Sequence, residues 1–284
     1  MKRMALIRVS AALAALLGVW IAYTQNPQAP AQNSLQKVKD DLYVIEGDGG
    51  NVAIYLTDDG VILVDDQFDR DFNDIMAKVK SLSAKPVRYV FNTHHHPDHS
   101  GSNEKMLITA EVIAQRNARV NMVNGKQPGP PRLTFGDQAQ VFLGGKEVEA
   151  WHFGRGHTNG DAVIYFPALR VLHAGDLFTV APNFPPLIDY AGGGSAVDWT
   201  KTLDEVLKLD FDTVIPGHGP VSKREDVVKF RQTMEMMRHR VRAMLREHKG
   251  KDDIGRMLTT EFFWQDFHKQ RGLDGLIAEM QQQR

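Results

Sequence analysis

A short, histidine-rich stretch constrains the fold and chemistry of this chain more than any other part of its sequence. Residues 92–101 read NTHHHPDHSG and directly follow the apolar run Val87 to Phe91, which predicts a buried strand. The histidines are therefore expected on a loop at the end of that strand. Neutral imidazole nitrogens and carboxylate oxygens are the ligands that Zn²⁺ and similar divalent ions prefer. Imidazoliums packed this closely without a metal would repel one another, so the stretch predicts a metal site over a surface tract or a pH-sensing cluster.

The spacing within the stretch indicates which side chains can share an ion. Successive side chains of an extended backbone point to opposite sides, so we expect His94 and His96 on one side and His95 facing away. Pro97 then bends the chain, which lets Asp98 and His99 face a second point. One loop can therefore serve two metals, with His95 a ligand of neither.

Two later histidines stand beside glycine at predicted strand ends. His157 follows one glycine, and His218 has a glycine on each side. Because glycine lets the backbone approach closely, both histidines are candidates to complete the ligand set. His152 and His173 lie within predicted strands, and we expect them to be packed or hydrogen-bonded.

The composition excludes several kinds of protein and site. The 284 residues include no cysteine, so a metal must be held by His, Asp or Glu, and no disulfide framework can form. The 34 basic and 35 acidic residues give a formal net charge of −1, which argues against a nucleic-acid partner. A hydrophobic content of 42% is ordinary for one globular α/β domain or two small ones.

The first 31 residues predict a bacterial export signal. Lys2, Arg3 and Arg8 precede a nearly uncharged apolar run from Val9 to Tyr23, and a Pro/Gln/Ala-rich stretch follows it. Cleavage is expected near Ala31. The alternative is an uncleaved N-terminal anchor, although the run is short for a span of about twenty residues. Either interpretation predicts a periplasmic or secreted domain, with membrane contact only through this segment.

The rest of the chain alternates predicted strands and helices. Apolar runs split by turn sequences predict a β-meander over residues 42–64. Apolar spacing predicts helices over residues 72–82, 198–209, 227–249 and 274–283. The Gly/Pro/Asn-rich residues 121–136 predict a long loop, either a connection or a lid. Asp65 and Asp66 end a predicted strand, as a cap or beside the site.

The pattern His94-x-His96-x-Asp98-His99 resembles the signature of the metallo-β-lactamase superfamily, and His157, Asp176 and His218 resemble its later motifs. The resemblance extends over roughly residues 37–221. It implies an α/β fold, a four-layer αβ/βα sandwich of two mixed sheets flanked by helices. Residues 37–221 would form the catalytic domain, and the helical residues 222–284 would pack on it.

The resemblance also implies how the ligands divide between two ions. Alone, Asp176 reads as an ordinary Gly-Asp turn residue, but in the superfamily such an aspartate bridges two metals. Asp98 would be both a ligand and the catalytic residue that orients the nucleophile or carries its proton. The implied sets are His94, His96 and His157 for one ion and Asp98, His99 and His218 for the other, with Asp176 between them.

The implied activity is metal-dependent hydrolysis of a small molecule. Two zinc ions on the order of 4 Å apart would lower the pKa of a shared water toward about 7; iron or manganese are the alternative ions. The metal-bound hydroxide would attack the carbonyl of a cyclic amide or ester, of β-lactam or lactone type. Phe184 and Tyr190, in an aromatic and proline-rich stretch after Asp176, are the expected substrate contacts.

Three alternative functions stay open. Metallo-β-lactamases usually carry cysteine or serine where this chain has Asp176, whereas thioesterases of the glyoxalase II type and lactonases carry aspartate. Export favours β-lactams, because glutathione thioesters are cytoplasmic substrates. The same ligand scaffold holds iron in persulfide dioxygenases, which is the second alternative. A non-catalytic metal-binding protein is the third.

Overall fold

The computed structural model describes residues 33–47, 49–180 and 185–282, which belong to one compact unit, Gln32–Arg284. The predicted export segment, residues 1–31, and the predicted substrate contact Phe184 lie outside the described residues. Within the described ranges, no helix is both long enough and apolar enough to cross a membrane.

Seven strands form the first sheet, sheet A, in the order β1 to β7. Neighbours from β1 to β4 are antiparallel, and those from β4 to β7 are parallel. The strands are β1 (Ser34–Lys39), β2 (Leu42–Glu46), β3 (Val52–Leu56), β4 (Val61–Val64), β5 (Val87–Asn92), β6 (Glu111–Gln115) and β7 (Leu133–Phe135). Strands β2 to β4 confirm the predicted meander, and β5 confirms the strand before the histidines.

Six strands form the second sheet, sheet B, in the order β13-β12-β11-β10-β9-β8. All its neighbours are antiparallel except β11 and β12, which are parallel. The strands are β8 (Gln138–Leu143), β9 (Lys146–Trp151), β10 (Val163–Phe166), β11 (Val171–His173), β12 (Thr213–Ile215) and β13 (Ser222–Lys223).

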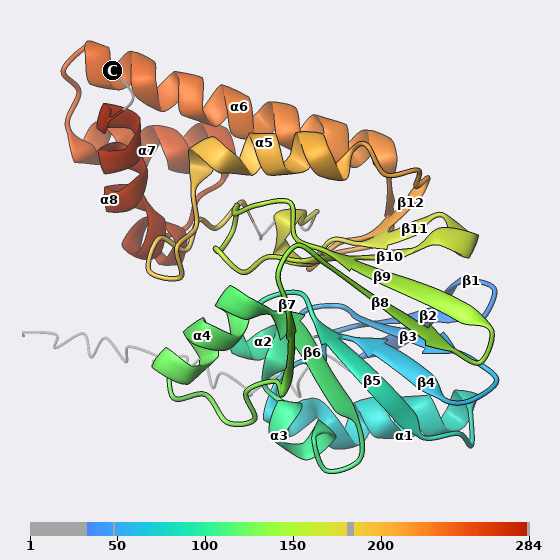
Figure 1. Cartoon of the computed structure of the whole chain (residues 1–284). Coiled ribbons are helices and arrows are strands. Elements are labelled where there is room, and N and C mark those ends of the chain that lie inside the picture. Colours follow the sequence, from blue (N-terminus) through green and yellow to red (C-terminus); the bar gives the residue numbers. More distant parts are fainter. Residues whose placement is uncertain (1–32, 48, 181–184, 283–284) are drawn as a thin grey trace, which may run out of the picture. The chain divides into compact units, whose positions relative to one another are not determined.

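Helices cover the outer face of each sheet (Figure 1). The longer ones are α1 (Phe72–Leu82), α4 (Arg116–Asn124), α5 (Ala196–Val206), α6 (Arg224–Arg246), α7 (Lys251–Phe262) and α8 (Asp266–Gln282). Single turns are η1 (Asp69–Asp71), α2 (Pro97–Ser100), α3 (Asn103–Met106), η2 (Pro167–Leu169) and η3 (Gly175–Leu177). Helix α1 lies on sheet A, and α5 and α6 lie on the side of sheet B (Figure 1).

Buried apolar side chains fill three spaces between these layers. Ile75 and Val79 of α1 pack against sheet A, where strands β3 and β4 are almost continuously apolar because both faces of the sheet are covered. Tyr55 and Phe166 meet edge to face between the two sheets. The third space lies between sheet B and the C-terminal helices. These four layers confirm the predicted αβ/βα sandwich.

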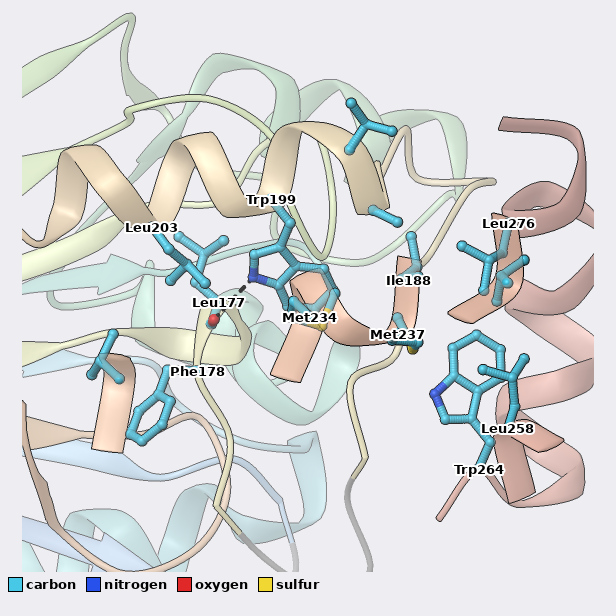
Figure 2. Close-up of a cluster of buried hydrophobic side chains, with 14 of the residues drawn as sticks. Leu177, Phe178, Ile188, Trp199, Leu203, Met234, Met237, Leu258, Trp264 and Leu276 are labelled. Atoms are coloured by element: carbon cyan, nitrogen blue, oxygen red, sulfur yellow. Dashed lines mark hydrogen bonds between the residues drawn. The ribbon is translucent and has the colours of Figure 1, made fainter. Parts of the chain in front are cut away.

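Trp199 of α5 occupies the third space and ties it to a loop of sheet B. Its side chain is fully buried, and its Nε1 donates to the carbonyl of Leu177 at 3.0 Å (Figure 2). Met234 of α6 packs in the same cluster. Because Leu177 ends η3, this packing fixes the segment that carries Asp176.

Several predicted boundaries were wrong, each for a local reason. The predicted loop 121–136 is shorter, because α4 continues to Asn124 and strand β7 takes up Leu133–Phe135. Helix α6 ends at Arg246, before the predicted Gly250, and His248 adopts a left-handed backbone there. Helix α7 then begins after Gly250. Helix α8 begins at Asp266, eight residues before the predicted start at residue 274, and buries His268.

Candidate metal centre

The seven predicted ligand residues converge on loops that follow strands. His94, His96, Asp98 and His99 come after β5, and α2 begins at Pro97. His157 lies between β9 and β10. Strands β11 and β12 are parallel neighbours, so the loops that carry Asp176 and His218 leave the same edge of sheet B.

The first group consists of His94, His96 and His157. Nδ1 of His96 lies 3.1 Å from Nε2 of His94 and 2.9 Å from Nε2 of His157. Ligand atoms of the three residues all lie within 4.8 Å of one another. The predicted side for His94 and His96 is confirmed, and the fold adds His157 from 61 residues along the chain.

Each imidazole of the first group has one nitrogen, here called the outer nitrogen, that points away from the other two rings. The hydrogen bond that the outer nitrogen makes determines whether the inner nitrogen carries a proton or a lone pair. His157 donates from Nδ1 to the carbonyl of Leu187 at 2.6 Å, and His96 donates from Nε2 to Oδ2 of Asp189 at 2.9 Å. Nδ1 of His94 lies 3.1 Å from Oγ1 of Thr93. A neutral imidazole carries one proton, so lone pairs meet at the centre. A cation at that point satisfies them, and the donor set therefore fits a divalent metal.

The second group consists of Asp98, His99 and His218. Nε2 of His218 lies 3.3 Å from Nε2 of His99 and 3.2 Å from Oδ2 of Asp98. His99 is fully buried and donates from Nδ1 to Oδ2 of Asp65 at 2.8 Å. Two imidazoles and a carboxylate converging in this way form a second cluster able to bind a metal.

Asp176 lies between the two groups. Its Oδ2 is 3.6 Å from Nε2 of His157, and its Oδ1 is 3.2 Å from Nε2 of His99. Oδ1 is buried, and no hydrogen bond of regular geometry from the described residues reaches it. A Cβ at position 217 would lie 1.9 Å from this oxygen, so only glycine leaves room for the carboxylate. This placement fits the predicted bridging role.

The two groups differ in charge without a metal. Burial lowers the pKa of His94 well below its usual value and that of His157 to about 4, so these imidazoles are neutral at pH 7. Burial also lowers the pKa of His218, but Asp176 and Asp98 outweigh it and raise the value to about 9. The pKa of His99 is likewise raised by Asp176, Asp98 and Asp65, against the effect of burial. Protons therefore take the place of a cation in the second group.

Two outer partners were not identified from the sequence. Asp189 is separated from His96 by 93 residues, and no local pattern marks its contact. Asp65 was expected at a strand end, as a cap or beside the site, but not as the partner of His99. A usable signal existed for it, because β4 and β5 are parallel neighbours and Asp65 therefore leaves the sheet beside Thr93. Asp65 accepts from the backbone N of Thr93 at 2.7 Å.

The other predicted residues lie elsewhere. His95 lies outside the two groups described above, but its Nε2 is 3.8 Å from Oδ2 of Asp189, and His95, His96 and Asp189 form a further cluster able to bind a metal. His152 and His173 bond backbone carbonyls, as expected. The fold does not bring Tyr190 to the clefts described below: its hydroxyl donates to Oε2 of Glu279 at 2.7 Å, on α8.

A cleft of about 380 Å³ opens over both groups. Its apolar walls include Phe68, Pro97, Leu187 and Phe267, and Arg271 of α8 adds a cation. Phe68, His96, Pro97 and Arg271 also line an adjoining cleft of about 1070 Å³. The cleft size and its mixed lining suit a small molecule.

Residues 45–218 match the model of the metallo-beta-lactamase superfamily. A 2,4-dinitroanisole O-demethylase subunit alpha from Nocardioides sp. (strain JS1661) is 31% identical over 50% of this chain and 43% of its own length. The chain thus spans less than half of that relative. Metallo-beta-lactamase IND-1 from Chryseobacterium indologenes is 29% identical over 59% of this chain and 71% of its own.

Solved structures show the same fold. A metallo-beta-lactamase from Pontibacter korlensis superposes with a TM-score of 0.66 at 18% identity, over 72% of this chain and 99% of its own. The DIM-1 metallo-beta-lactamase superposes with a TM-score of 0.64 at 18% identity, over 73% of this chain and 99% of its own. Since the matched family model covers more than half of the sequence, the chain belongs to the metallo-β-lactamase superfamily.

Proposed function

We propose that this protein is an exported, dinuclear zinc-dependent hydrolase that opens a cyclic amide or ester of β-lactam or lactone type. One observation carries the proposal: two groups of three candidate ligands flank the carboxylate of Asp176 at the floor of one cleft. Each group supplies three protein ligands, which would leave an ion room for water or substrate, as catalytic metal sites require. The histidine-rich groups favour zinc over magnesium or calcium.

Bound zinc ions would acidify water at neutral pH and polarise the scissile carbonyl. Around them, Asp98 holds a carboxylate oxygen at the cleft, where 25% of its side chain is exposed. Nearby His99 and His218 lower its pKa despite burial, so it stays ionised and would serve as a metal ligand that orients the nucleophile. Phe68, Leu187 and Phe267 line the cleft and would limit the water around a bound substrate.

Arg271 is the side chain best suited to orient a charged substrate. It lines both clefts, and its guanidinium lies 4.6 Å from the ring centroid of Phe267. Among the described residues, no carboxylate forms an ion pair with it. Its charge therefore remains available to an anionic group of a substrate whose carbonyl lies over the two groups.

A second candidate is a thioesterase of the glyoxalase II type. The central carboxylate of Asp176 favours it, because the metallo-β-lactamase pattern usually has cysteine or serine there. The O-demethylase relative suggests an aryl methyl ether as a further substrate to test, within its limited coverage.

The test combines metal content with turnover by one preparation. Purified protein is analysed for metals by atomic emission and assayed with nitrocefin, a γ-lactone, a glutathione thioester and 2,4-dinitroanisole. Two zinc equivalents with opening of nitrocefin or the lactone support the proposal; turnover of only the thioester or the ether selects that alternative. Iron with oxygen consumption, or zinc without turnover, contradicts it. Fractionation of cells that express the full chain tests export.

A further inference from the structure

Residues 187–195 bond the outer nitrogens of two of the three imidazoles in the first group. We call this segment the clamp loop. The carbonyl of Leu187 accepts from His157, and the carboxylate of Asp189 accepts from His96. Its backbone also bonds the loop that carries His157, since the Asp189 amide donates to the His157 carbonyl at 2.9 Å. The position of the clamp loop therefore sets the orientation of two of the three imidazoles.

Glu279 of α8 holds the far end of the clamp loop. Its Oε2 accepts from the hydroxyl of Tyr190 at 2.7 Å and from the backbone N of Ala196 at 3.0 Å. Its Oε1 accepts from the hydroxyl of Ser195. Because Ala196 is the first residue of α5, the carboxylate also lies at a helix N-terminus, where negative charge is favoured.

The face of α8 around Glu279 is shaped for close contact with the clamp loop. Gly272 and Gly275 precede Glu279 by seven and four residues, so all three lie on one helix face. A Cβ at position 275 would meet the ring of Tyr190 at 2.3 Å. Glycine is a poor helix former, and this approach explains its presence here. Ile188 of the clamp loop is fully buried in the core that includes Leu276 (Figure 2).

We propose that Glu279 is a positioning residue for the first group: by holding the clamp loop, it fixes the imidazoles of His96 and His157. The inference relies on the proposed function, which takes these histidines as ligands. It predicts an unequal effect on the two ions. The clamp loop does not orient His99 of the second group, because Asp65 at the end of β4 holds the outer nitrogen of that imidazole.

The test measures zinc affinity in variants that retain one group each. His218→Ala leaves the first group complete, and His94→Ala leaves the second. Zinc is titrated against a chromophoric chelator, so no substrate is needed. Adding Glu279→Ala should lower the zinc affinity of the first group about tenfold. Loss of a hydrogen-bond partner behind a metal ligand lowers metal affinity by about 10- to 100-fold, and the effect of Glu279 is indirect. The second group should bind zinc as before.

Two variants serve as controls. Glu279→Gln keeps an oxygen for Tyr190 and Ala196, and its amide can meet the Ser195 hydroxyl, so it should restore most of the affinity. Asp274→Asn alters an exposed carboxylate of the same helix, which pairs with Lys251 at 2.6 Å, and should change neither group. If Glu279→Ala does not fold, Tyr190→Phe should weaken the first group about two- to threefold and spare the second.

The outcomes separate this inference from the proposed function. Equal weakening of both groups, or no weakening of the first, overturns the role of Glu279 while the metal site stands. Failure of both one-group variants and the unmodified chain to bind zinc overturns the proposed function, and the inference with it.

Discussion

Oδ2 of Asp65 lies 2.8 Å from Nδ1 of His99, and both side chains are fully buried. The same oxygen accepts from Oγ1 of Thr93 at 2.8 Å, and that hydroxyl oxygen lies 3.1 Å from Nδ1 of His94. Asp65 thus orients one imidazole of each group. Its backbone is left-handed, with φ of 62°, a conformation that aspartate adopts more readily than most residues.

Replacing Asp65 should lower the zinc affinity of both groups, whereas Glu279→Ala should lower that of the first group alone. We expect Asp65→Ala to reduce zinc affinity about 10- to 100-fold in each one-group variant, because both imidazoles lose their orientation. Asp65→Asn keeps one oxygen and should lie between Asp65→Ala and the unmodified chain. Chelator competition measures all three, and an effect confined to one group would contradict the shared role of Asp65.

Substitution of the candidate ligands should empty the sites separately. His94→Ala or His157→Ala should remove one zinc equivalent, and His218→Ala should remove the other. His95→Ala should leave metal content intact, because His95 lies outside both groups. Atomic emission on dialysed protein provides the count. Loss of zinc from His95→Ala alone would show that the division of the loop is wrong.

Zinc binding should release protons mainly from the second group. At pH 7, His94 and His157 are neutral, whereas the pKa of His218 is raised to about 9 and that of His99 is also raised. A metal must displace those protons. Affinity of the second group should therefore rise with pH up to about 9, more steeply than that of the first. Calorimetry of the one-group variants in buffers of different ionisation enthalpy counts the protons; equal release would refute this.

The same shift predicts how the metal-free protein responds to pH. Because the folded state raises the pKa of His218 from 6.5 to about 9, it binds a proton that the unfolded state has lost in this range. The stabilisation is complete below pH 6.5 and lost as pH rises through about 9. Urea denaturation of the metal-free chain should show this decline, and His218→Ala should reduce it.

Trp199 should dominate the stability of the third core space. Trp199→Ala should lower the free energy of unfolding by about 3–5 kcal/mol, since it removes a fully buried side chain. Trp199→Phe leaves the Leu177 carbonyl without its donor and should cost about 1–3 kcal/mol. Urea denaturation measures both. Met236→Ala, at a side chain that is 57% exposed, should change stability by less than about 0.5 kcal/mol.

Arg271→Ala should discriminate between substrates by charge. For a substrate turned over by the protein, KM should rise about tenfold if it carries a carboxylate, close to the lower end of the 1.5–3 kcal/mol of a charged hydrogen bond. KM for an uncharged analogue and kcat for both should change little. Arg240→Ala, whose guanidinium pairs with exposed Glu261, is the matched control. An equal rise in KM for both substrates would show that Arg271 does not read charge.

Much of the architecture was predictable from local pattern. Apolar spacing placed α1 at residues 72–82, and apolar runs placed β2 to β5, because these elements bury one periodic face or a whole strand. Helix ends were less predictable. Helix α8 begins at Asp266 and buries His268 against distant parts of the chain, a contact that is not encoded in neighbouring residues.

The sequence by itself determined the chemical identity of the site: clustered imidazoles and carboxylates without cysteine, with His94 and His96 on one side of an extended backbone and His95 on the other. Those features depend on residue type and on the period of the backbone, which are local. Only the tertiary structure decided that Asp189 bonds His96, that Asp65 serves both groups, and that Tyr190 faces Glu279. These contacts join residues dozens of positions apart, so their geometry follows from how sheets and helices pack.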